Sequence, residues 1–134
     1  MVEMQVAGIA LDAASRSPIV LLRDPSGRRQ VPIWIDQAQA QNILAGLNAD
    51  PPPRPLSHDL MVALLKAGGL QLDRVIIHAI EASTFQAVLK LSPAGPKDDT
   101  TSTKPSTPSI ELDARPSDGI ALALRTGSPI WMLE

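Results

Sequence analysis

The pattern of hydrophobic and polar positions predicts strands over the first quarter of the chain. Residues 4–11 and 18–23 are apolar-rich runs of strand length, and residues 28–35 alternate between apolar and polar side chains. Between the last two runs, Asp-Pro-Ser-Gly at 24–27 has proline and glycine where a β-turn favours them. We therefore expect an antiparallel meander, with Pro32 at an edge or irregularity because proline cannot donate to a ladder.

Three later segments have the apolar period of helices. The first begins at Asp36, where an aspartate followed three residues later by Gln39 matches a capping box, and it ends before three consecutive prolines. The second runs from Ser57 to a glycine pair, and the third from Ser117 to Arg125, before Gly127. Further strands are predicted at 72–82 and 84–91, as a hairpin with its turn near Ser83, and at 110–113 and 129–133.

The segment 92–109 differs in composition from the rest of the chain. It holds four prolines, many serines and threonines and no large apolar side chain, which predicts a flexible loop. We expect one domain, 1–134, of the α+β class: a mixed, mostly antiparallel β-sheet packed with about three helices. The likeness of Val-Pro-Ile-Trp-Ile at 31–35 to Ser-Pro-Ile-Trp-Met at 128–132 suggests an internal pseudo-repeat.

Composition narrows the classes of function. Of 134 residues 44% are hydrophobic but only 2% aromatic, so the core must be built from alanine, valine, isoleucine and leucine. The net charge of −2 gives no general basic surface for nucleic acid, and the lack of cysteine removes disulfides and thiolate zinc sites. No apolar run approaches the ~20 residues that cross a bilayer, and the N-terminal residues do not resemble a signal peptide. A cytoplasmic protein that does not enter membranes is expected.

Two similar motifs stand ahead of the second and third predicted helices. They read Arg-Pro-Leu-Ser-His-Asp-Leu at 54–60 and Asp-Ala-Arg-Pro-Ser-Asp-Gly-Ile at 113–120. A structural interpretation accounts for both motifs: Ser57 and Ser117 are N-caps, and Asp59 and Asp118 complement the helix dipoles. In that interpretation the arginines pair with nearby carboxylates.

A chemical interpretation of the same residues points to phosphate. An arginine beside a helix N-terminus is an anion site, so Arg54 and Arg115 are candidate phosphate ligands. His58 adds a general acid or base, which together with the arginines supplies the parts for phosphodiester hydrolysis.

The motif aspartates offer a further route to the same chemistry. Asp113 and Asp118, with Asp59, are candidates for holding a divalent cation such as magnesium or manganese, which would polarise the phosphate. We expect the two motifs to face each other, with Arg54 beside Asp118 or Asp113 and Arg115 beside Asp59.

The two motifs, together with the block Val-Pro-Ile-Trp-Ile at 31–35, resemble the signature blocks of the bifunctional nuclease family. The blocks stand in the family's order, and the resemblance covers nearly the whole chain apart from 92–109. It implies an enzyme that degrades RNA and DNA. The candidate catalytic residues are then His58, Asp59, Asp113 and Asp118, and the candidate substrate-binding residues Arg54, Arg115, Ser57 and Ser117.

Three positions depart from the family pattern, and they keep a second function open. Asp36 stands where the family usually has glycine, Gln39 where it has glutamate, and Gly119 where it has alanine. If that glutamate binds metal or acts as a base, this chain has lost it. The acidic net charge and the missing glutamate favour the alternative, a non-catalytic ligand-binding or protein-interaction module that forms a homodimer or small homo-oligomer.

Overall fold

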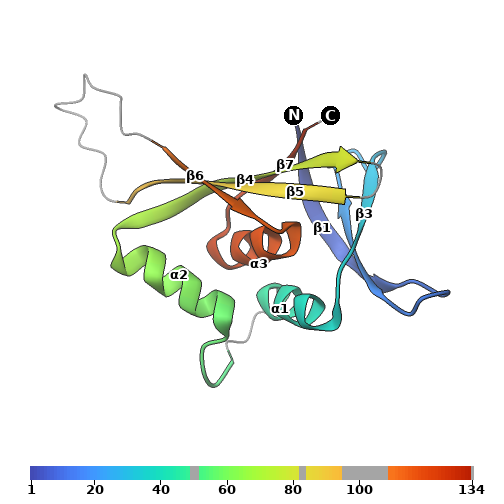
Figure 1. The fold of residues 1–134 in the computed structure, drawn as a ribbon, viewed down its shortest axis with the longest axis horizontal. Helices are drawn as coiled ribbons and strands as arrows, with labels where there is room; N and C mark the ends of the chain where they lie inside the picture. The colour runs from blue at the N-terminus through green and yellow to red at the C-terminus, as the bar shows by residue number, and fades with distance from the viewer. Residues whose placement is uncertain (49–51, 82–83, 95–108, 134) are drawn as a thin grey trace.

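The computed structural model describes residues 1–48, 52–81, 84–94 and 109–133. Over these residues a seven-stranded mixed sheet has three helices on one side, which confirms the predicted α+β class (Figure 1). The strand order is β3-β2-β1-β7-β4-β5-β6. In chain order the elements are β1 (Val2–Leu11), β2 (Pro18–Arg23), β3 (Gln30–Trp34), α1 (Gln37–Leu47), α2 (Ser57–Ala67), β4 (Leu70–Glu81), β5 (Thr84–Pro93), β6 (Ile110–Ala114), α3 (Pro116–Thr126) and β7 (Ile130–Met132).

The first three strands form the predicted antiparallel meander. β1 pairs with β2 and β2 with β3, and the Gly27 amide donates to the Asp24 carbonyl at 3.0 Å to close the predicted turn. Pro32 lies in β3, at one edge of the sheet, so its missing N–H costs no interior ladder bond. Turn chemistry and alternation were therefore sufficient to predict this region.

The second half of the sheet combines local and distant pairings. β4 and β5 form the predicted hairpin, whose expected turn near Ser83 lies outside the described residues. β7 lies between β1 and β4, antiparallel to the first and parallel to the second, so the two ends of the chain are neighbours (Figure 1). This insertion makes the sheet mixed.

The predicted loop at 92–109 begins later than expected. Ser92 and Pro93 belong to β5, where Ser92 pairs with Gln71 and its hydroxyl donates to Asp73 at 2.9 Å. Pairing with the neighbouring strand overrides the loop-like composition at these two positions. Most of the predicted loop, 95–108, lies outside the described residues.

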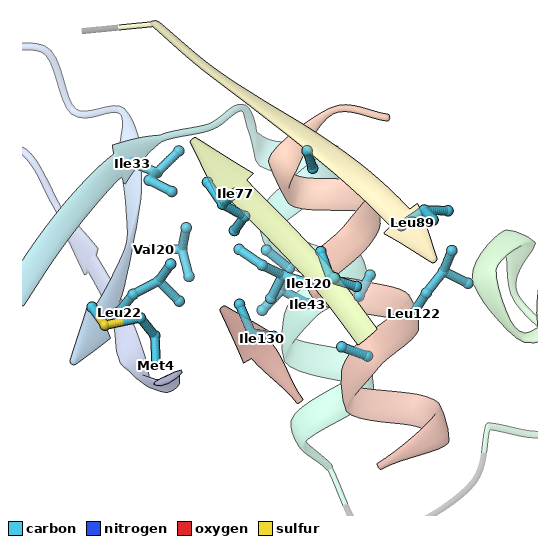
Figure 2. Packing of buried hydrophobic residues seen from close by; sticks show 14 of the residues in the cluster. Met4, Val20, Leu22, Ile33, Ile43, Ile77, Leu89, Ile120, Leu122 and Ile130 are labelled. Atoms are coloured by element: carbon cyan, nitrogen blue, oxygen red, sulfur yellow. The ribbon is translucent and has the colours of Figure 1, made fainter. Parts of the chain in front are cut away.

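The core lies between the sheet and α3, and it is built almost entirely from aliphatic side chains, as the composition predicted (Figure 2). α3 is the central helix: its buried residues include Ile120 and Ala121, both fully buried, and α1 and α2 each pack on it. Gly119 allows α3 to approach the sheet, because a Cβ there would lie 2.8 Å from Cγ1 of Val75. None of the helices described is long and apolar enough to cross a bilayer.

The starts of α2 and α3 differ from the prediction. The N-caps are Leu56 and Arg115, so Ser57 and Ser117, predicted as caps, lie inside the helices. At α3, Pro116 occupies the first helical position, where proline is favoured, and this moves the helix start ahead of the serine. At α2 the Asp59 carboxylate accepts from the Leu56 amide at 2.8 Å and supplies the cap from within the first turn.

Candidate functional site

The central contact of the candidate site joins the two predicted motifs. Nε2 of His58, in the first turn of α2, lies 2.9 Å from Oδ1 of Asp118, in the first turn of α3. The His58 side chain is 6% exposed and that of Asp118 24%. The two residues are 60 positions apart, so the packing of α2 on α3 creates the pair. The expectation that the motifs face each other is confirmed here.

Arg115 completes this cluster from the N-cap of α3. Its Nε donates to Oδ2 of Asp118 at 2.8 Å, and its Nη2 donates to Oδ1 at 3.2 Å. Burial raises the pKa of Asp118, but the hydrogen bonds from Arg115 and His58 lower it by more than burial raises it. The pKa therefore lies below the ordinary 3.8. Asp118 is therefore an anion at neutral pH, with both oxygens engaged.

The state of the His58 ring follows from that anion. A carboxylate can only accept, so Nε2 of His58 carries the proton that lies toward Asp118. Nδ1 is buried and has no partner in the described part of the chain. The Asp118 carboxylate thus orients the ring, and Nδ1 is the nitrogen left for other chemistry.

A small pocket of about 80 Å³ surrounds the pair where the three helices meet. Its lining comes from the first half of α1 and its N-cap, the first turn of α2 and the start of α3. The lining residues are Asp36, Ala38, Gln39, Asn42, His58, Arg115, Ser117 and Asp118. Four of the predicted site residues, His58, Arg115, Ser117 and Asp118, therefore share one cavity.

The wall supplied by α1 was not predicted as part of a site. Asp36 and Gln39 form the predicted capping box: Oδ1 of Asp36 accepts from the Gln39 amide at 2.8 Å, and Oε1 of Gln39 accepts from the Asp36 amide at 2.7 Å. Both positions depart from the family pattern, and this was the one signal that could have pointed to them. Asn42 carries no such signal in the sequence.

Ser117 turns toward the same cavity. Gly119 faces the sheet, and at about 100° per residue a side chain two positions earlier points to the opposite side of the helix. Ser117 is 3% exposed, and its hydroxyl oxygen has no hydrogen-bond partner among the described residues. The pocket wall therefore contains two unsatisfied buried polar atoms, Nδ1 of His58 and Oγ of Ser117.

Asp59, the aspartate of the first motif, does not line the pocket. Oδ1 of Asp59 accepts from Nε of Arg125 at 2.7 Å, and its other oxygen caps Leu56. The cap and the Arg125 hydrogen bond both lower the pKa of Asp59 below its ordinary 3.8. The predicted pairing of Arg115 with Asp59 is wrong: Arg115 bonds Asp118 three residues further along its own motif, and the packing of α2 on α3 brings Arg125 to Asp59 instead.

In the sequence Arg125 marked only the end of the third predicted helix, but the structure gives its side chain a larger role. It is 8% exposed and lies in α3, and it joins the three helices. Besides Asp59 of α2, Nη1 donates to the Asn42 carbonyl of α1 at 3.0 Å and to the Ala121 carbonyl at 2.9 Å. No local pattern predicts partners 66 and 83 positions away.

Arg54, Ser57 and Asp113 also lie outside the pocket. Arg54 and Ser57 are exposed, and Arg54 makes no ion pair with any described residue, so its predicted pairing with Asp118 or Asp113 is not found. Asp113 lies exposed on β6 and accepts from Nε2 of Gln86 at 2.6 Å. It lines a separate open hollow on the other side of Arg115.

The geometry does not suit the predicted cation site. Asp113 and Asp118 line different cavities, and within the described ranges no three His, Asp or Glu side chains are placed to share a metal ion. The two carboxylates of the pocket are already engaged, Asp36 by the Gln39 amide and Asp118 by His58 and Arg115. This donor set differs from the free carboxylates that magnesium prefers.

Comparison with known proteins identifies relatives of the whole chain. A family model described as the bifunctional nuclease domain matches residues 20–134. Uncharacterized proteins from two strains of Mycobacterium tuberculosis are each 37% identical over 134 residues, which covers 100% of this chain and 73% of each relative.

Proposed function

Because the chain belongs to the bifunctional nuclease domain family, we propose that it hydrolyses phosphodiester bonds of RNA, DNA or both at the pocket between the three helices. The observation that supports this most directly is the 2.9 Å contact between His58 and Asp118. It joins the two signature motifs, and a histidine oriented by a carboxylate is a common general base.

The proposed roles follow from the hydrogen bonds. Asp118 holds the His58 ring with Nε2–H toward itself, so Nδ1 is the nitrogen that accepts a proton from the water that attacks phosphorus. One P–O ester bond breaks as the new P–O bond forms, and the leaving oxygen takes a proton from solvent. Arg115 lies at the start of α3, where the first amides have no helical partners, and these groups bind the phosphate. Nδ1 is buried, so α1 or the side chains that line the pocket must move slightly when the substrate binds.

The test uses purified protein with single-stranded RNA and with single-stranded DNA, in magnesium, in manganese and in chelator. His58→Ala should lower the rate by about 10²–10⁴-fold, as expected for a lost general base. His78→Ala is the matched control, because His78 is the other histidine and lies half-buried in β4, away from the pocket. A His58→Ala, Asp118→Asn double variant as active as wild type would assign the activity to a contaminant and reject the proposal.

A second candidate function is a non-catalytic ligand-binding or protein-interaction module. It is favoured by the charges of the pocket: Asp36 and Asp118 provide two carboxylates against the single guanidinium of Arg115. Such a pocket attracts a phosphate weakly. The amide of Gln39, in place of the family's glutamate, also removes one candidate base.

Gln39→Glu separates these two functions. If the chain has kept the fold but lost hydrolytic activity, the wild-type protein should be inactive and the Gln39→Glu variant should hydrolyse the substrate. A chain that is already a nuclease should be active without it. Hydrolysis absent from both proteins would favour the binding module.

A further inference from the structure

An open hollow lies beside the pocket between the three helices, at the place where β6 ends and the chain turns into α3 (Figure 1). The strand register explains it: Ala87 pairs with Ala114, the last residue of β6, so β5 continues past the end of its partner. Phe85 and Gln86 therefore have no strand beside them on that side among the described residues. The hollow has a volume of about 560 Å³, within the usual range of ligand sites, and we call it the edge hollow.

Arg115 connects the edge hollow with the pocket between the three helices, because it lines both. On the pocket side its Nε and Nη2 bond Asp118, and the rest of the side chain is largely exposed. A phosphate bound at Arg115 therefore has the edge hollow directly beside it. The base carried by the same nucleotide is then within reach of that hollow.

The apolar part of the edge hollow suits a nucleobase. It is lined by Ile80, which is 54% exposed, and by Phe85, which is half-buried. Phe85 is the only phenylalanine in a chain with 2% aromatic residues. Bases of single-stranded nucleic acids stack on aromatic rings with little regard to sequence, so Phe85 supplies contact area but no choice among bases.

The polar part of the edge hollow presents two hydrogen-bond acceptors. Nε2 of Gln86 donates to Oδ1 of Asp113 at 2.6 Å, and because a carboxylate only accepts, this bond fixes which end of the amide faces Asp113. Oε1 of Gln86 and Oδ2 of Asp113 remain, and neither has a partner among the described residues. Both of these oxygens accept hydrogen bonds and neither donates.

On the basis of the proposed hydrolysis of nucleic acid, we propose that the edge hollow binds a guanine base next to the phosphate that is cleaved. Guanine presents two adjacent donors, N1–H and the 2-amino group, on its Watson–Crick edge, and these match the acceptors of Gln86 and Asp113. Adenine and cytosine offer one donor beside an acceptor, and uracil and thymine one donor between two acceptors. Each of these bases leaves one acceptor of the protein opposite another acceptor, so Gln86 and Asp113 select guanine while Phe85 stacks on it.

A metal ion or a second phosphate fits the edge hollow less well. Asp113 is the only acidic side chain that lines it, and within the described ranges no three His, Asp or Glu side chains are placed to share a metal ion. The same carboxylate repels a phosphate. A neutral ligand that carries two donors is the one that these acceptors suit.

The first experiment is titration calorimetry of the wild-type protein with the nucleoside monophosphates GMP, IMP and AMP. These ligands contain no phosphodiester bond, so their binding does not depend on hydrolysis. GMP should bind roughly tenfold more tightly than AMP or better, and IMP, which lacks the 2-amino group, should lie between them. Equal affinities for GMP and AMP, or no binding of GMP up to about 10 mM, would overturn the proposal.

Asp113→Asn tests the residue that selects the base. Gln86 still donates to Oδ1, so the amide nitrogen of the new side chain becomes a donor toward the base, and the preference for GMP over AMP should fall below about threefold. Asp73→Asn is the matched control, because Asp73 also accepts from a glutamine side chain, that of Gln71, and lies outside the edge hollow. Its variant should keep the wild-type preference. An Asp113→Asn protein that still selects GMP as wild type does would reject the proposal.

Cleavage of single-stranded RNA of mixed sequence separates this proposal from the proposed hydrolysis. If both hold, wild type should cut next to guanine roughly tenfold more often than next to adenine, and Asp113→Asn should cut without that preference. Cleavage by wild type with no preference among bases would reject the guanine site and leave the hydrolysis standing. Selective binding of GMP by a protein that cleaves nothing would support the guanine site and reject the hydrolysis.

Discussion

The two Arg-Pro motifs are similar in sequence, and the structure uses them differently. At α3, Arg115 bonds Asp118 of its own motif, and the next residue, Gly119, packs against the sheet. At α2, Asp59 bonds Arg125 of another helix, and the residue that follows it, Leu60, is 54% exposed. Helix α3 is central and α2 peripheral, so the position of each helix in the fold decides what the same local sequence does.

The largest changes in the free energy of unfolding are expected at the residues that follow Asp118 and Asp59. Gly119→Leu should destabilise the fold by more than about 4 kcal/mol, because even a Cβ there would lie 2.8 Å from a methyl group of the fully buried Val75. Leu60→Gly should cost only about 1 kcal/mol, the difference in helix propensity. Urea unfolding at low protein concentration measures both, and similar losses for the two variants would contradict the central position of α3.

The two arginines that bond the motif aspartates should also differ in how much they contribute to the free energy of unfolding. Arg125→Met should cost roughly 3 kcal/mol, because the buried guanidinium that bonds all three helices is lost and the partly buried Asp59 carboxylate loses its cation. Arg115→Met should cost less than about 1 kcal/mol, because the Arg115 side chain is 63% exposed. Chemical denaturation of the two variants tests this order, and the reverse order would disprove it.

The free energy of unfolding should depend on pH through both Asp59 and Asp118. The folded-state pKa values of Asp59 and Asp118 lie below the ordinary 3.8, so below that pH the unfolded state binds more protons than the folded state. The stability that these carboxylates contribute is present above pH 4 and is lost as pH falls through the folded pKa values. Unfolding free energies measured from pH 5 to pH 2 should fall less steeply in Asp59→Asn and in Asp118→Asn, and unchanged slopes in both would refute this account.

The smallest effect is expected at the α1 wall of the pocket. Gln39→Glu should change the free energy of unfolding by less than about 0.5 kcal/mol, because glutamate at this position completes the same capping box. Gln39→Ala should cost on the order of 1 kcal/mol, since one half of the box is removed. Thermal melts can compare the two, and a large loss in Gln39→Glu would show that the pocket does not tolerate another carboxylate.

The sequence predicted those features that depend on neighbouring residues. The meander followed from alternation and from the turn at 24–27, and the start of α1 followed from the spacing of Asp36 and Gln39. The end of α3 followed from Gly127, which adopts the left-handed conformation with φ of 70°. The lining of the pocket was predicted only in part: His58 and Asp118 came from the motifs, whereas Asp113 and Arg54 lie outside that pocket.

The tertiary structure decided which of these groups meet. The sequence alone determined the alternation, the turn at 24–27 and most helix ends, because those depend on residues within a few positions of one another. Only the fold placed β7 between β1 and β4, brought Asp36 and Gln39 beside His58, and paired Asp59 with Arg125. The bonds that join α2 and α1 to α3 connect residues 60, 66 and 83 positions apart, and packing of distant elements, which no local pattern encodes, selects such partners.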